Sequence, residues 1–168
     1  MNKKVLVISN NCFSKNYNNR KTLESIFSGI SISNRAQIYF TKTGYPDLEF
    51  CKNYYCISEE EIFTSFFNNK NNIKTHVKEE VKITGLFEKS GLKKIFLSQQ
   101  SLIRLFRDLL WVSNFWKTDS LKKWCIDQSP DFIFFVGGPG KFSYNVSIYV
   151  SELLKIPIIT FFTDDYLI

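Results

Sequence analysis

The sequence predicts an α/β fold built on a mainly parallel, doubly wound sheet of the Rossmann-like type. Three apolar runs, residues 4–9, 132–136 and 156–162, lack polar alternation, which is typical of strands buried on both faces. Apolar residues recur at helical spacing between them, and strands that alternate with helices favour a parallel sheet. We therefore expect residues 1–168 to form a single Rossmann-like domain.

The N-terminal third begins with the strand at 4–9, followed by a polar loop over 10–19 that contains five asparagines. A short helix is expected over 22–29. Its apolar face is predicted to consist of three residues, Leu23, Ile26 and Phe27. Residues 36–40 form the second predicted strand. Ser58-Glu59-Glu60-Glu61 then fits a capping box that opens a helix. The apolar face of that helix would be Ile62, Phe63, Phe66 and Phe67.

Residues 68–100 form a basic insertion in this plan. The segment holds seven lysines and three glutamates, and these charges supply most of the net charge of +6. One interpretation is an exposed insertion with some helix. The other is a basic amphipathic surface that rests on anionic lipid, so an anionic membrane surface is a possible partner.

The C-terminal third returns to a regular pattern. Helical spacing is found from 101 to 111 and again from 120 to 127, before the strand at 132–136. A glycine-rich turn ends that strand, and a helix is expected over 142–154. The run at 156–162 is the last predicted strand. Because the chain stops shortly after it, we expect the sequence to be part of a longer protein.

Composition narrows the function classes. The four cysteines show no metal-ligand spacing and there is one histidine, so we expect reduced thiols, no metal site and no cofactor. No segment has the length of a signal-peptide core or a membrane span, which favours the cytoplasm. The pI of about 9.1 permits nucleic acid binding. Lysines with few arginines and no recognisable module argue against it.

Candidate site residues come from the loops that follow the predicted strands, because ligands of open α/β sheets bind beyond the carboxyl ends of the strands. The first loop leads into a helix N-terminus and suits a phosphate or an array of sugar hydroxyls. Its candidate binding residues are Asn18, Asn19, Arg20, Lys21 and Thr22. The later loops add Gly137, Gly138, Asp165 and Tyr166 as binding residues, and Asp164 as the candidate catalytic residue.

The turn after residue 136 also imitates a dinucleotide fingerprint. Gly138-x-Gly140-x-x-Ser143 lies between a strand and a helix, and acidic residues end the next strand. Against this interpretation, the third small residue is serine and no second half of the fold follows. A tight strand-to-helix turn at a ligand-facing edge is the preferred interpretation.

Taken together, five segments resemble the N-terminal domain of retaining, GT-B-fold glycosyltransferases of family 4, of the bacterial surface-polysaccharide kind. These segments are residues 4–10, 18–23, 107–111, 130–135 and 156–160 running into Asp164. The resemblance covers nearly the whole chain and is weakest over 68–100. It departs from the family at Arg20, where a glycine is expected, and at Thr163-Asp164, where many relatives carry a His-Asp pair.

The resemblance implies an acceptor-binding domain in the cytoplasm, at the inner face of the membrane. It implies that the partner molecules are a glycan or lipid-linked acceptor and a nucleotide-sugar donor. The donor would be held by a C-terminal domain that this sequence lacks, so the fragment alone would be inactive. The alternative is a non-enzymatic α/β module that binds a nucleotide or has a regulatory role.

Overall fold

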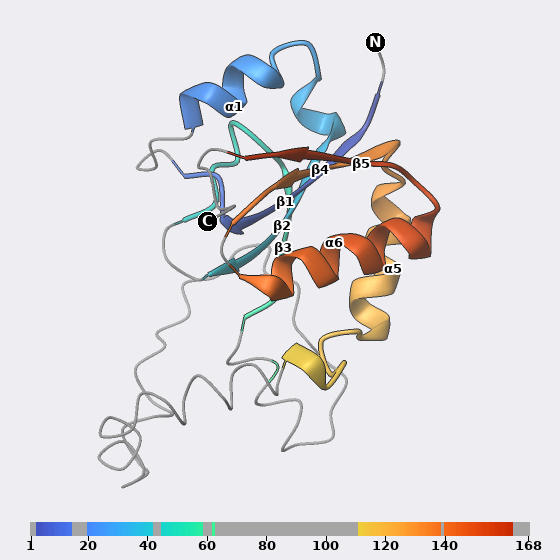
Figure 1. Cartoon of the computed structure of the whole chain (residues 1–168). Helices are drawn as coiled ribbons and strands as arrows, with labels where there is room; N and C mark the ends of the chain where they lie inside the picture. The colour runs from blue at the N-terminus through green and yellow to red at the C-terminus, as the bar shows by residue number, and fades with distance from the viewer. Residues whose placement is uncertain are drawn as a thin grey trace, which may run out of the picture.

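The computed structural model describes residues 3–14, 20–41, 45–58, 62, 111–138 and 140–162 (Figure 1). Several predictions lie outside these residues. They are most of the capping-box helix at 58–67, the basic insertion at 68–100, the helix at 101–110 and the final loop at 163–166. Ile62 and Trp111, the described residues nearest to the insertion on either side, are buried in the core.

The described strands form a parallel sheet, as the sequence predicts. The strands are β1 (Val5–Asn11), β2 (Arg35–Thr41), β3 (Asn53–Cys56), β4 (Phe132–Val136) and β5 (Ile158–Phe161). Their order in the sheet is β3-β2-β1-β4-β5, and every neighbouring pair is parallel. This is the Rossmann-like order with β1 in the centre.

Helices lie on both sides of the sheet (Figure 1). Helix α1 (Arg20–Ile26) lies on one side, and α5 (Asp119–Gln128) and α6 (Lys141–Leu154) lie on the other. A 3-10 turn at Ile32–Asn34 leads into β2. The alternation within β1 explains the double burial: Leu6 and Ile8 pack on the α5/α6 side, whereas Val5 and Val7 pack on the α1 side.

The α5/α6 side holds the larger apolar cluster. Leu121 and Cys125 of α5 and Val146 and Val150 of α6 pack on the sheet. Serines 143 and 147 of α6 are also fully buried, and each hydroxyl donates to a backbone carbonyl about one turn earlier. These small residues let α6 lie close to the strands beneath it, which holds its N-terminal end in place at the sheet edge.

On the α1 side the predicted helix face is partly wrong. Leu23 and Phe27 are buried, but Ile26 is 42% exposed. The helix ends at Ile26, and Leu23 and Phe27, one turn apart, fill the contact with the sheet. Ile26 precedes Phe27 by one residue and so points about 100° away from it around the helix axis. A seven-residue helix buries only a narrow stripe.

The two outer strands also differ from the expectation. Strand β3 was not predicted, although Tyr54, Tyr55 and Cys56 are all buried. Strand β5 was predicted as fully buried, yet Ile159 is 50% exposed. Ile159 pairs with Phe134, which belongs to the α1-side cluster, so its exposed side chain lies on that side of the sheet. Phe27, directly after α1, packs on the Phe134 ring of β4 with 4.9 Å between the ring centres, whereas Ile159 on the next strand stays half exposed.

Candidate binding site at the carboxyl ends of β1 and β4

The sheet order defines one position where a ligand would be expected. From β1 the chain crosses through α1 to β2, whereas from β4 it crosses through α6 to β5, in the opposite direction. The loops after β1 and β4 therefore diverge, and a crevice at such a switch point is the usual ligand site of open α/β sheets. The residues that meet there are Asn10 and Asn11 from β1 and Gly137 and Gly138 after β4.

Gly138 touches the Asn10 amide. A Cβ on Gly138 would lie 2.6 Å from Nδ2 of Asn10, closer than real Cβ contacts come. A side chain at position 138 would thus displace Asn10. The backbone after β4 therefore lies directly against the Asn10 side chain at the end of β1.

The neighbouring glycines also face protein side chains. A Cβ on Gly137 would lie 2.5 Å from the ring of Phe162, and a Cβ on Gly140 would lie 2.4 Å from the ring of Phe142. In a dinucleotide fingerprint the space freed by the glycines admits the diphosphate. Here Asn10, Phe142 and Phe162 fill it, which weighs against the dinucleotide interpretation of this turn.

A fully buried glutamine fixes the chain that leaves β1. Gln37 of β2 has no exposed surface. Its Nε2 donates to the Ser9 hydroxyl at 2.7 Å and to the Asn11 carbonyl at 3.0 Å, and its Oε1 accepts from the Phe13 N–H at 2.9 Å. All polar atoms of Gln37 are therefore satisfied, and the start of the loop is tied to the neighbouring strand.

Thr41 provides a second tie at the end of β2. Its hydroxyl lies 2.9 Å from the carbonyl oxygen of Asn10 and 2.6 Å from Oδ1 of Asn11. The backbone of Asn10 is thus held from one side while Gly138 lies against its side chain. The position of the Asn10 amide is set by the sheet and not by a free loop.

The side-chain oxygen of Asn10 has no partner. Oδ1 is buried and accepts no hydrogen bond among the residues that the structure describes, although Asn10 as a whole is only half-buried. A buried acceptor without a donor costs about 1–3 kcal/mol. Asn10 therefore carries an unsatisfied acceptor at the switch point.

The strand ends at this site are uncharged. Ser9, Asn10, Asn11, Thr41 and the glycines supply only amides, hydroxyls and backbone groups. Helix α6 begins nearby at Lys141, and its N-cap is Gly140, which provides no side-chain hydrogen bond to the helix. The arrangement suits polar, uncharged ligand groups, because it offers donors and acceptors but little charge.

The predicted site residues are only partly placed. Gly137 and Gly138 lie at the switch point and are buried. Lys21 and Thr22 are exposed on α1, and Arg20 is the first residue of that helix. The remaining predicted residues, Asn18, Asn19, Asp164, Asp165 and Tyr166, lie outside the described part of the chain. Their roles stay predictions.

Sequence reasoning did not single out Asn10, Gln37 or Thr41. A signal was available for Gln37, because an amide in the middle of the apolar run at 36–40 must be buried and satisfied if that run is a central strand. No comparable signal exists for Asn10. Its importance depends on contact with Gly138, more than a hundred positions away in the chain.

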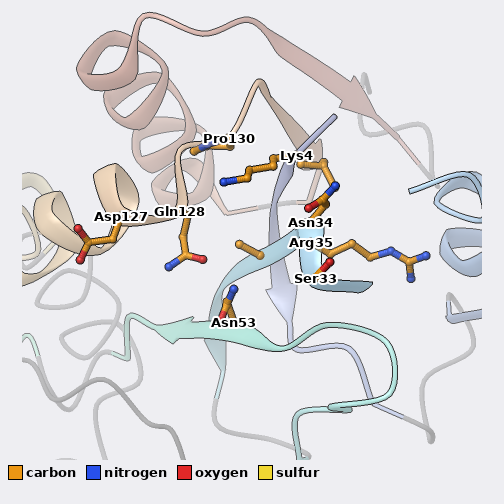
Figure 2. A pocket seen from close by; sticks show the side chains of 10 residues that line it. Lys4, Ser33, Asn34, Arg35, Asn53, Asp127, Gln128 and Pro130 are labelled. Atoms are coloured by element: carbon orange, nitrogen blue, oxygen red, sulfur yellow. The ribbon is translucent and has the colours of Figure 1, made fainter. Parts of the chain in front are cut away.

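The opposite end of the sheet carries a small pocket of about 130 Å³ between the amino ends of the strands and the end of α5 (Figure 2). It is lined by Lys4, Val5, Ser33, Asn34, Arg35, Ala36, Asn53, Asp127, Gln128 and Pro130. The guanidinium of Arg35 extends away from the pocket in Figure 2. A pocket this small has room for little more than a few water molecules, and it is far from the switch point.

Two charged groups at this amino end, the Arg35 guanidinium and the Asp131 carboxyl, are already used by the fold. Arg35 donates to the carbonyls of Phe27, Ile30 and Phe50 over 2.6–3.2 Å, which closes the end of α1. Asp131 accepts from the Lys4 backbone N–H at 2.8 Å, and this hydrogen bond lowers the pKa of the Asp131 carboxyl. These residues are structural.

The cysteines offer no obvious reactive group. All four are buried and free. Burial raises the pKa of Cys51 and of Cys125 to about 12, so both thiols stay protonated at neutral pH. Within the described ranges, no three His, Cys, Asp or Glu side chains are grouped so as to hold a metal ion. In the same part of the chain, no helix is long and apolar enough to cross a membrane.

Comparison with protein-family models, with curated proteins and with solved structures gave no match.

Proposed function

We propose that this domain binds the acceptor in a sugar transferase whose donor is held by a second unit. The observation that carries the proposal is the uncharged, amide-lined switch point between β1 and β4. Amides and hydroxyls that both donate and accept hydrogen bonds match the hydroxyl groups of a glycan. The parallel sheet with helices on both sides is the architecture that such a domain requires, although many other functions use it as well.

The same residues disfavour the diphosphate of a nucleotide-sugar as the ligand of this crevice. A diphosphate needs backbone N–H groups that it can approach closely, or basic side chains. The described residues at the ends of β1, β2 and β4 carry no charge, and side chains of the protein fill the spaces beside Gly137, Gly138 and Gly140. This supports the proposal that the domain takes the acceptor role and that the donor is bound elsewhere.

The finer parts of the proposal rest on the resemblance to family 4 glycosyltransferases. Asp164 remains the candidate catalytic group, and Arg20 and Lys21 remain candidates for contact with the leaving diphosphate. A lipid-linked acceptor at the inner face of the membrane would bring the basic segment 68–100 close to anionic headgroups.

The competing function is a nucleotide-binding or regulatory module without catalysis. A binding comparison separates the two. The purified chain is applied to a printed array of neutral and acidic glycans, and a panel of UDP- and GDP-sugars is titrated by calorimetry. An acceptor domain gives saturable glycan signals and no nucleotide-sugar affinity tighter than about 1 mM, close to −4 kcal/mol. Tight nucleotide binding with an empty array would overturn the proposal in favour of the module.

A further inference from the structure

The unpaired oxygen of Asn10 points to the part of the ligand that this site would contact. We propose that the Asn10 amide bonds the ligand directly and that its target is an uncharged hydroxyl group, not a phosphate. This inference rests on the proposed function and deepens it. It adds Asn10 as a contact residue that the sequence did not indicate. It also chooses sugar hydroxyls over a phosphate, the two ligand groups that the loop after β1 suits.

The first argument is the unsatisfied acceptor. Oδ1 of Asn10 is buried without a donor among the described residues, while the neighbouring amide of Asn11 and the amide of Gln37 are both bonded within the protein. A ligand hydroxyl would donate to this oxygen and remove the cost of leaving it unpaired. A phosphate dianion has no proton to donate, and its oxygens would be repelled by Oδ1.

The second argument is placement. The Thr41 hydroxyl holds the Asn10 backbone. Gly138 leaves just enough space for the Asn10 amide, because a Cβ added to Gly138 would lie 2.6 Å from Nδ2 of Asn10. The amide is therefore held at the switch point before a ligand arrives, which lowers the entropic cost of binding.

The third argument is the lack of compensating charge among the described residues at the ends of β1 and β2. An anion at this position would face Asn10, Asn11 and Thr41, none of which is cationic. Lys141 at the start of α6 is the nearest basic residue along the chain after the glycine turn, and its side chain is exposed. A neutral hydroxyl needs no such charge, and a Ser9–Gln37–Asn11 hydrogen-bond network already stabilises the polar surroundings.

The experiment uses ligand-observed saturation-transfer NMR on the full chain. The probes are a set of methyl hexopyranosides and, separately, inorganic phosphate. Three variants are compared with the unchanged protein. Asn10→Leu keeps the approximate shape but removes the acceptor, and Asn10→Asp keeps acceptor oxygens. Asn53→Ala is the matched control, because Asn53 begins β3 and lies at the amino end of the sheet, opposite the switch point. Circular dichroism melting verifies that every variant is folded.

The expected result is glycoside binding that weakens at least about tenfold in Asn10→Leu, the effect of roughly one good hydrogen bond. Asn10→Asp should bind within a few-fold of the unchanged protein, and Asn53→Ala should match it. Glycoside binding that is equal in all four proteins overturns the role of Asn10 and leaves the acceptor function standing. Phosphate binding that depends on Asn10 overturns the hydroxyl assignment. If neither probe binds, the inference and the glycan-binding function fail together.

Discussion

The two ends of the sheet use their polar groups in different ways. At the amino ends of the strands, the Arg35 guanidinium donates to backbone carbonyls, and the Asp131 carboxyl accepts from a backbone N–H. At the carboxyl ends of β1 and β4 the described groups are neutral amides, hydroxyls and backbone atoms, and the Asn10 oxygen is left without a donor in the described structure. The first arrangement stabilises the fold, whereas the second leaves a polar group for a ligand. This difference distinguishes a structural polar cluster from a candidate site.

The strongest test of the comparison is Arg35→Ala. Arg35 is buried, its guanidinium donates to three carbonyls, and it lies 4.8 Å from the centre of the Phe50 ring. Its removal leaves those acceptors unpaired, so we expect the free energy of unfolding to fall by on the order of 3 kcal/mol. Urea denaturation measures the change. Arg35→Lys should recover little of it, because an ammonium cannot reach all three carbonyls.

Lys21→Ala is the matched control for Arg35, since Lys21 is an exposed cation on α1. It should change the free energy of unfolding by less than about 0.5 kcal/mol. Equal effects of the two substitutions would show that net charge, and not the carbonyl contacts, underlies the role of Arg35.

The second prediction concerns Gln37 of β2, whose side chain ties the end of β1 and the loop after it to β2. Gln37→Leu preserves volume but leaves the Phe13 N–H, the Ser9 hydroxyl and the Asn11 carbonyl without this partner. We expect a loss of about 2 kcal/mol in the free energy of unfolding. Hydrogen exchange at the Phe13 amide should also accelerate, since that N–H is bonded to Gln37.

Measuring the free energy of unfolding of Asn10→Leu tests whether Asn10, unlike Gln37, is free of a structural role. Because Oδ1 of Asn10 is already unpaired, its removal should cost far less stability than the Gln37 change. If Asn10→Leu proves as destabilising as Gln37→Leu, then Asn10 is a structural residue and the two ends of the sheet do not differ in the way described.

The smallest expected effect is at Asp131. The Lys4 N–H, and then Lys3, lower the pKa of this carboxyl below its ordinary 3.8. Ionised Asp131 therefore contributes stability at neutral pH, and this contribution disappears as the pH falls through the lowered pKa of the folded state. The unchanged protein should be slightly more stable than Asp131→Asn at pH 7, and the difference should vanish toward pH 2. Thermal melting across that range measures it, and a difference that grows in acid would reverse the assignment.

Much of the fold could be predicted because the central strands are buried on both faces. The apolar runs that contain Leu6, Ile38 and Phe134 need no knowledge of their neighbours to be recognised as strands. The outer strands lack this property. Strand β3 consists of an asparagine, two tyrosines and a cysteine, and it is buried by segments that its own sequence does not reveal. The burial of β5 depends on what lies over each side, so Ile159 was assigned to the interior incorrectly.

The candidate site was predictable only at the level of the strand ends. A glycine turn after an apolar run indicates where Gly137 and Gly138 lie, because such turns follow buried strands in this architecture. The partner of Gly138 could not be predicted, since Asn10 comes into contact with it only when β4 pairs with β1. Local sequence patterns therefore predicted which end of the sheet holds the candidate site, whereas only the pairing of β1 with β4 identifies Asn10 as the residue in contact with Gly138.

The central place of β1 has a consequence for how the protein is made. Val5 pairs with Arg35 on one side and with Phe132 on the other. Ribosomes add roughly 5–20 residues per second, so β2 is available to pair with one edge of β1 within a few seconds of the synthesis of β1. Strand β4, which pairs with the other edge, is completed on the order of ten seconds later. During that interval Leu6 and Ile8 lie beside an unpaired strand edge. The nascent N-terminal half is then a natural substrate for chaperones, and slower synthesis of the middle segment would prolong its exposure to aggregation.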